Sequence, residues 1–256
     1  MRASIHGGYG WKPDLPGKLK RRYSAPQTAL PNSVDLRPGF PSPPYDQGQL
    51  GSCTANALVG AVEFAQKKED KWHFIGSRLF VYYNTRELEG TTDSDAGGTI
   101  SDAVAAANKF GVCQETDWVY DVAQFATKPP DNAYKAAAMD LVLVSAAVDQ
   151  TLPEMQGCLA AGFPIDIGFT VYDSFESSAV ASTGVVPMPN TATENVLGGH
   201  SVLIVGYDNA NPNPTFIVRN SWGTGWGDKG YCYFPQAYLL NPDMASDFQT
   251  IRKVQW

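Results

Sequence analysis

Apolar residues recur at helical spacing in the first half of the chain and predict three helices. The clearest pattern covers about residues 52–68, where one apolar stripe runs along the predicted helix and two lysines stand at its end, where the helix dipole favours cations. We predict that this helix is central and buried. Further helices are predicted near residues 78–88 and 101–109. The stripe consists of Leu58, Ala61, Val62 and Ala65, widened by Val59 and Phe64.

The pattern changes from residue 164 onward. Short runs rich in β-branched and aromatic residues, separated by turn residues, predict a mostly antiparallel sheet. A helical first half and a β-rich second half predict an α+β fold with two lobes and a cleft between them. The predicted strands cover residues 165–171, 201–205, 216–218 and 231–234.

The first 45 residues lack either periodicity. Residues 1–29 carry six basic residues against one acidic residue, so this N-terminal arm has a formal charge of +5, and −12 remains for the rest of a chain whose total is −7. Tyr9 and Trp11 favour a groove for the arm, although termini are also often loose. Five prolines in residues 30–45 predict extended chain without helix.

Composition excludes several classes of function. The chain has 256 residues, of which 43% are hydrophobic, so it can bury a sizeable core. Its acidic balance gives no general attraction to nucleic acid or anionic membranes. No apolar stretch approaches the roughly 20 residues that span a bilayer, and the start lacks the apolar region of a signal peptide. We expect a cytoplasmic or non-classically secreted monomer.

Cysteine and histidine are too scattered to indicate a metal site. None of the four cysteines is paired at Cys-x-x-Cys spacing, and the three histidines are far apart. We therefore expect no metal and no organic cofactor. The density of cysteine is also far below that of a disulfide scaffold. These residues are Cys53, Cys113, Cys158, Cys232, His6, His73 and His200.

Three residues together indicate nucleophilic catalysis. Cys53 stands at the start of the central helix, where backbone amides and the helix dipole stabilise a thiolate. His200 opens a predicted strand and Asn220 ends the next one, which provides a base and a group to orient it. Taken singly, each has an ordinary alternative: a buried core cysteine, a core histidine and a turn residue.

Five segments in the same order resemble the papain family of cysteine proteases, over nearly all of residues 30–256. The resemblance implies a papain-like fold, with a helical lobe mainly in 46–135 and a β lobe mainly in 136–256. It implies hydrolysis of polypeptide substrates through a thioester, and binding of papain-family inhibitors. The segments are residues 30–37 (LPNSVDLR), 47–53 (QGQLGSC), Gly97–Gly98, Gly199–His200 and 220–227 (NSWGTGWG).

The resemblance also assigns roles. Cys53 is the nucleophile, His200 the general base and then acid, and Asn220 the group that orients the imidazole. Gln47 donates to the oxyanion together with the Cys53 N–H, and Trp222 shields the hydrogen bond between Asn220 and His200. In the family the thiolate and imidazolium form an ion pair before substrate arrives. A solvated loop amide and a plain core aromatic are the alternatives for Gln47 and Trp222.

Glycines are expected to bind the substrate backbone. By the same resemblance Gly97 and Gly98 pair with the substrate main chain as an added strand. Gly199, directly before the histidine, permits close backbone approach. Gly168 aligns with a wall of the main specificity pocket and indicates a roomy pocket, although a strand glycine beside close-packed backbone is the alternative.

The chain departs from the family pattern in three places. Leu50 and, approximately, Asp95 stand where the family has the two halves of a disulfide, which favours a reducing compartment and free thiols. Thr54 replaces the aromatic that usually follows the nucleophile. Only about 29 residues precede the mature-like start, an arm similar to that of some bacterial members.

We hypothesise that the arm closes the active site. Residues 8–11 would cross the cleft, with Tyr9 or Trp11 in a specificity pocket, and the basic run 18–22 would dock on the acidic body and offer a processing site. The main alternative is a binding protein with the same fold and a permanently occluded cleft. Peptide ligation would use the same residues. Glycines 223, 225 and 227 lack the context of a nucleotide loop.

Overall fold

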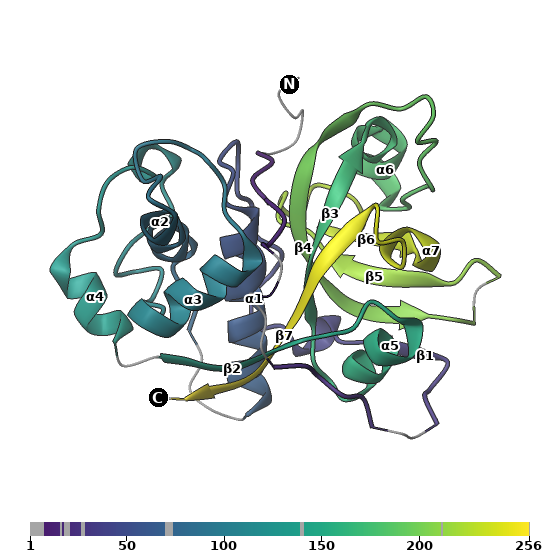
Figure 1. The fold of residues 1–256 in the computed structure, drawn as a ribbon, viewed down its shortest axis with the longest axis horizontal. Coiled ribbons are helices and arrows are strands. Elements are labelled where there is room, and N and C mark those ends of the chain that lie inside the picture. Colours follow the sequence, from purple (N-terminus) through teal and green to yellow (C-terminus); the bar gives the residue numbers. More distant parts are fainter. Residues whose placement is uncertain are drawn as a thin grey trace.

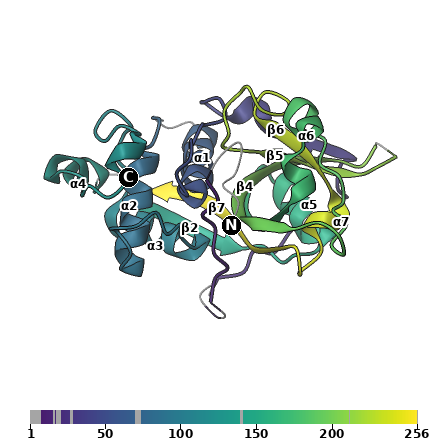
Figure 2. The same ribbon diagram turned by 90° about the horizontal axis from the view of Figure 1, so that it is seen from above.

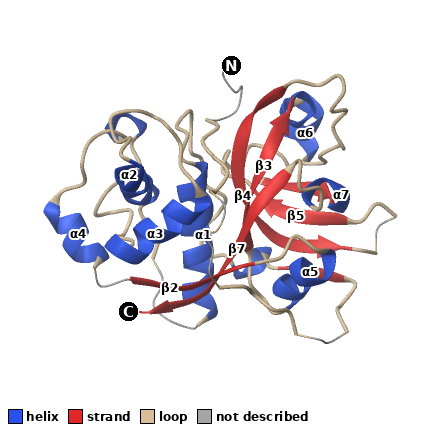
Figure 3. Cartoon of the chain, in the orientation of Figure 1, coloured by secondary structure: helices blue, strands red, loops and turns tan. Residues whose placement is uncertain are grey.

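The computed structural model describes residues 8–15, 17, 21–26, 29–69, 74–138, 141–210 and 212–255. Two lobes are evident (Figure 1), with helices on one side and an antiparallel sheet on the other. Figure 3 shows the same division, coloured by secondary structure. The predicted α+β fold is confirmed. The helices are α1 (Cys53–Lys68), α2 (Arg78–Glu89), α3 (Ile100–Phe110), α4 (Asp131–Ala137), α5 (Leu152–Ala160), α6 (Ser178–Thr183) and α7 (Gln236–Leu239).

The three predicted helices are present within two residues of the predicted ends. The helix α1 is buried at every position from Cys53 to Gln66, because it packs against other helices on one side and the sheet on the other. Figure 2 shows it between α2 and β4. Glycine ends the next two helices: Gly90 and Gly111 both have positive φ, a conformation that costs glycine little.

The sheet is antiparallel, with strand order β2-β7-β3-β4-β5-β6, and β1 pairs with β4. All four predicted strands are confirmed, and the structure adds three more. In β3, Phe169 lies opposite His200 of β4 and Gly168 lies opposite Ser246 of β7. The strands are β1 (Ser33–Asp35), β2 (Leu141–Ala147), β3 (Ile165–Tyr172), β4 (Val196–Asp208), β5 (Thr215–Arg219), β6 (Tyr231–Pro235) and β7 (Ala245–Gln255).

The proline-rich segment is more structured than predicted. It contains strand β1 and a short 3-10 turn, Arg37–Gly39, so the expectation of chain without helix is wrong for these residues. The turn forms because a proline near the first position of a helical turn loses no hydrogen bond there. Within the described residues no helix is both long and apolar enough to cross a membrane.

Two cores support the cleft. One lies within the sheet lobe, where Phe169, Phe175 and Phe234 pack edge to face or stacked, with ring centroids 5.0–5.6 Å apart. The other fills the space between α1 and the sheet and joins Leu58 and Val62 to Leu203. Because α1 and β4 are packed directly together, the residues at their facing ends are held in fixed relation.

Candidate active site

Cys53 is the first residue of α1, and its side chain is fully buried. Burial raises the pKa of the thiol to about 11, although backbone N–H groups of Ser201, Gly10 and Thr54 favour the thiolate. One of those donors, Gly10, belongs to the N-terminal arm. The arm therefore lies directly against the thiol and keeps it out of water.

The imidazole of His200 is oriented by Asn220. Nε2 of His200 lies 2.8 Å from Oδ1 of Asn220, and the same Oδ1 accepts the N–H of Ser221 at 2.8 Å. Because Oδ1 is an acceptor in both contacts, Nε2 carries the proton and Nδ1 keeps its lone pair. Nδ1 is buried and makes no hydrogen bond within the described part of the chain.

Trp222 covers the imidazole. Its ring stacks on that of His200 at a centroid distance of 5.1 Å and an interplanar angle of 29°, and Trp226 and Phe175 support it from behind. Burial lowers the pKa of His200 to about 4, against the opposing effect of the Asn220 hydrogen bond. The thiol and imidazole are thus neutral in this closed state. The ion pair implied by the family resemblance is disfavoured here, because the arm excludes the water that would solvate both charges.

Gln47 is a buried group with a fixed direction, so a solvated loop amide is the wrong description. Its Oε1 accepts from Oγ of Ser221 at 2.5 Å, and its Nε2 donates to the Leu50 carbonyl at 2.8 Å. The same Nε2 donates to the carbonyl of Gly8 at 2.9 Å. The amide therefore already binds a peptide carbonyl of the arm.

The backbone of the arm pairs with both walls of the cleft. On the helical side Gly98 donates to the Gly10 carbonyl at 2.8 Å and accepts from Lys12 N–H at 3.2 Å. On the sheet side the Trp11 N–H donates to the Gly199 carbonyl at 3.1 Å. The backbone of residues 10–12 is therefore paired with both walls as an added peptide segment and is not a loose tail.

The Trp11 side chain fills the space beside Gly168. A Cβ built on Gly168 would lie 1.8 Å from the indole ring, so only glycine permits this contact. Gly97 is equally constrained, because its φ is +68° and a Cβ there would lie 1.9 Å from the Gly10 carbonyl oxygen. The indole Nε1 donates to Oδ2 of Asp247 at 3.1 Å.

Tyr9 lies over His200 and Trp222 and not beside Gly168. Its ring meets His200 edge-on at 6.1 Å and is tilted against Trp222 at 6.2 Å, and its hydroxyl donates to the Glu176 carboxylate. Both aromatic residues singled out in the sequence are therefore in the cleft. Trp11 occupies the pocket beside Gly168.

The carboxylates that receive the arm were missed by sequence reasoning. Lys12 pairs with Glu89 at 2.5 Å, and Asp247 accepts from the Asp14 N–H at 2.9 Å as well as from the indole. No local pattern marks Glu89 or Asp247, because their role depends on the path of the arm. Of the basic run, residues 18–20 lie outside the described residues, and Arg22 pairs with Asp149 at 2.5 Å.

The structure shows what surrounds the residues that depart from the family pattern. Both oxygens of Asp95 lie 3.0 Å from the N–H of Gly51, the residue next to Leu50, so a hydrogen bond joins segments that the family links by a disulfide. All four cysteines are buried and free, as predicted. Thr54 is fully buried, and its hydroxyl has no hydrogen bond among the described residues.

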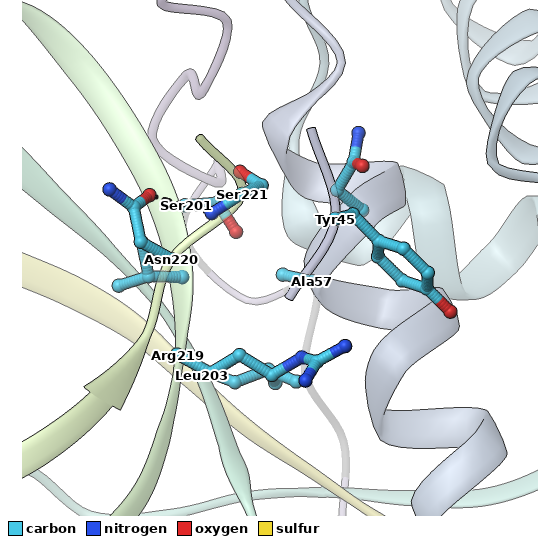
Figure 4. A pocket seen from close by; sticks show the side chains of 9 residues that line it. Tyr45, Ala57, Ser201, Leu203, Arg219, Asn220 and Ser221 are labelled. Carbon is cyan, nitrogen blue, oxygen red and sulfur yellow. Dashed lines mark hydrogen bonds between the residues drawn. The ribbon is translucent and has the colours of Figure 1, made fainter. Parts of the chain in front are cut away.

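Arg219 positions the strand end that carries Asn220. Arg219 lines a cavity of about 10 Å³ behind the site, among residues of α1, β4 and the end of β5 (Figure 4). The Arg219 guanidinium reaches across to the proline-rich segment, where it donates to the carbonyls of Ser42 at 3.1 Å and Pro43 at 2.6 Å. This buried contact ties β5 to the helical side directly before Asn220.

Known proteins resemble the chain over most of its length. Residues 30–246 match the family model described as papain family cysteine protease. An uncharacterized peptidase C1-like protein of Acanthamoeba polyphaga mimivirus is 44% identical over 218 residues, which are 82% of this chain and 69% of that protein. Thiol protease aleurain of Arabidopsis thaliana is 28% identical, over 83% of this chain and 58% of its own length.

Solved structures agree. Xylellain, a cysteine protease from Xylella fastidiosa, is 36% identical with a TM-score of 0.92, and the match covers 100% of this chain and 99% of that one. Digestive procathepsin L 3 of Tenebrio molitor, at 22% identity and a TM-score of 0.75 over 99% of this chain and 77% of that one, shows the fold alone. The chain belongs to the papain family of cysteine proteases and is a papain-like cysteine peptidase.

Proposed function

We propose that the chain is an endopeptidase that works through Cys53, His200 and Asn220. The observation that carries this proposal is the tautomer of His200. Its Nε2 proton is committed to Asn220, so its free Nδ1 is the atom available to accept a proton. Cys53 stands at the helix terminus, where backbone donors favour a thiolate once water reaches the site.

The reaction follows from these positions. Nδ1 of His200 takes the proton of Cys53, and the sulfur attacks the peptide carbonyl carbon. When the C–N bond breaks, the imidazolium gives its proton to the leaving amine and a thioester remains. Water then attacks the thioester with His200 again as base, which releases the acid and restores the thiol.

Gln47 and the Cys53 N–H would stabilise the oxyanion. Support comes from the Gly8 carbonyl, which Nε2 of Gln47 already binds at 2.9 Å. The amide is held by Leu50 and Ser221, so it need not reorganise when charge develops on the substrate oxygen.

The course of the arm supports an endopeptidase. Gly8 donates to the Gly48 carbonyl on one side of Cys53, and Lys12 reaches Gly98 on the other. A cleft that holds peptide on both sides of the nucleophile can accept the interior of a polypeptide. We assign the substrate backbone to Gly97, Gly98 and Gly199, and one side chain to the pocket beside Gly168.

We further propose that residues 1–29 form a pro-segment and that residues 30–256 form the peptidase domain of a monomeric zymogen. The arm occupies the backbone sites on both walls and excludes water from the thiol. The competing proposal, a binding protein whose cleft stays closed, requires that the arm never leaves.

Intact-mass spectrometry with an epoxide inhibitor of papain-like thiols tests both proposals. We expect slow addition of one inhibitor to the full-length chain and none to Cys53→Ala. Trp11→Ala, which empties the pocket beside Gly168, should accelerate labelling because the arm is loosened. Leu15→Ala is the matched control, since Leu15 is 69% exposed on the same arm. No labelling in any variant would favour the binding protein. Equal labelling rates in all variants except Cys53→Ala would show that the arm does not control access to Cys53.

A further inference from the structure

Two carboxylates contact the side chains of consecutive residues of the arm, Trp11 and Lys12. Trp11 Nε1 donates to Oδ2 of Asp247 at 3.1 Å, and Lys12 Nζ lies 2.5 Å from Oε2 of Glu89. Gly10, the preceding residue, lies against Cys53. A substrate strand in the same sites therefore places two adjacent side chains toward Asp247 and Glu89, at the Trp11 site and the Lys12 site.

Asp247 is held in an unusual backbone conformation. Its φ is +62°, in the left-handed region that aspartate and asparagine tolerate better than most residues. Its Oδ2 accepts both the Trp11 indole and the Asp14 N–H, at 3.1 and 2.9 Å. When the arm leaves, this partly buried carboxylate loses both of these donors and keeps only the hydrogen bond of the adjacent Ser246 side chain among the described residues, so part of its hydrogen-bonding capacity is unmet.

Among the described residues, no cation is found beside Asp247. Asp14 and Asp166 are its acidic neighbours, and burial raises the pKa of both Asp166 and Asp247. A cationic side chain in the pocket would offset this burial and favour the Asp247 carboxylate. The long indole that the pocket holds shows space for an extended side chain between Gly168 and the carboxylate.

Glu89 is fixed beside the substrate strand. It is the last residue of α2, and its Oε1 accepts the Thr99 N–H at 2.9 Å. A Cβ built on Gly98 would lie 3.4 Å from the same oxygen, so the carboxylate borders the glycine that pairs with the arm. The side chain of Glu89 is 11% exposed, and Lys12 is its cationic partner.

We propose that Asp247 and Glu89 select cationic side chains at two adjacent substrate positions, so that the preferred substrates are polypeptides with paired basic residues. The selection rests on the proposed peptidase function and adds its substrate class. Arginine suits the Asp247 pocket, because its planar fork can replace both lost donors. Residues 20–22 of this chain, Lys-Arg-Arg, have the same character.

Matched fluorogenic peptides test the selection. All variants are made in the full-length Trp11→Ala chain, whose pocket is open, and kcat/KM is compared for arginine against leucine at each of the two positions. We expect arginine to be favoured about tenfold or more at each position, the range of one charge-assisted hydrogen bond. Salt should reduce this preference.

Two variants test whether Asp247 and Glu89 cause the preference for arginine. Asp247→Asn, which keeps a residue suited to positive φ, should abolish the preference at the position that takes the Trp11 site. Glu89→Gln should abolish the preference at the position that takes the Lys12 site. Asp149→Asn is the control, because Asp149 contacts Arg22 outside the cleft. Equal rates for arginine and leucine, or a ratio unchanged in both variants, would overturn the selection while epoxide labelling of Cys53 kept the peptidase function intact. Loss of that labelling would instead refute the peptidase itself.

Discussion

The two walls of the cleft are built differently. On the helical wall, Gln47 and Cys53 lie within seven consecutive residues, and the Gln47 amide donates to the Leu50 carbonyl of the same segment. On the sheet wall, His200 comes from β4, and Asn220 and Trp222 come from the loop after β5; aromatic packing and a hydrogen bond hold them together. The first wall takes both of its reactive groups from one local segment, whereas the second is assembled from distant segments.

This difference separates two ways of holding a reactive group. A local segment fixes direction through the backbone, so a neighbouring side chain can change at little cost. A packed network fixes direction through every member, so the loss of one member disturbs the rest. Three variants test this contrast, in order of decreasing expected effect.

Gln47→Ala should have the largest effect, because it removes the one helical-wall side chain that we assign to the oxyanion. Loss of one preorganised donor lowers kcat about 100- to 1,000-fold. Steady-state kinetics on a fluorogenic peptide measure it, with the exposed Gln124→Ala as the control. A loss below tenfold would remove Gln47 from the oxyanion site.

Asn220→Ala should lower kcat/KM about 10- to 100-fold, the equivalent of one hydrogen bond at about 1.4 kcal/mol per factor of ten. The Asn220 hydrogen bond raises the pKa of His200, so its loss lowers that pKa further. The limb of the pH profile that the imidazole sets should move to lower pH. A limb that stays in place, at reduced activity, would show that Asn220 acts on folding rather than on the base.

Thr54→Val should have the smallest effect on activity, less than about twofold, although it adjoins Cys53. The Thr54 hydroxyl is buried without a hydrogen bond in the described residues, so the isosteric valine removes a buried polar group. A gain of about 1 kcal/mol would raise Tm by about 2–4 °C in a chain of this size. Thermal unfolding measures it, and a large loss of activity would show that this wall too depends on side-chain packing.

The same contrast explains what the sequence could predict. The helix α1 and strands β3 to β6 follow from periodicity within single segments. Strands β2 and β7 were missed, because they pair with each other across more than a hundred residues and β7 includes Asp247 at positive φ. Pairing at that range is a property of the assembled sheet, and a mixed polar pattern such as that of β7 does not indicate it.

The residues of the candidate site also fall into those that the sequence could identify and those that it could not. Cys53, His200 and Asn220 were identified because family motifs surround them, and the arm was expected in the cleft because its aromatic residues required a groove. Glu89, Asp247 and Glu176 were not identified, since isolated acidic residues have no distinguishing neighbours. Their importance arises where the arm passes, and no local sequence pattern encodes that path.

The burial of Trp11 also gives the molecule an optical reporter. The indole is 9% exposed and lies against Gly168, with its N–H on a carboxylate. Indole emission moves to longer wavelength when the ring passes from such a pocket into water. Opening of the cleft can therefore be followed in real time by the fluorescence of the chain itself, with Trp11→Phe to identify the signal among the six tryptophans.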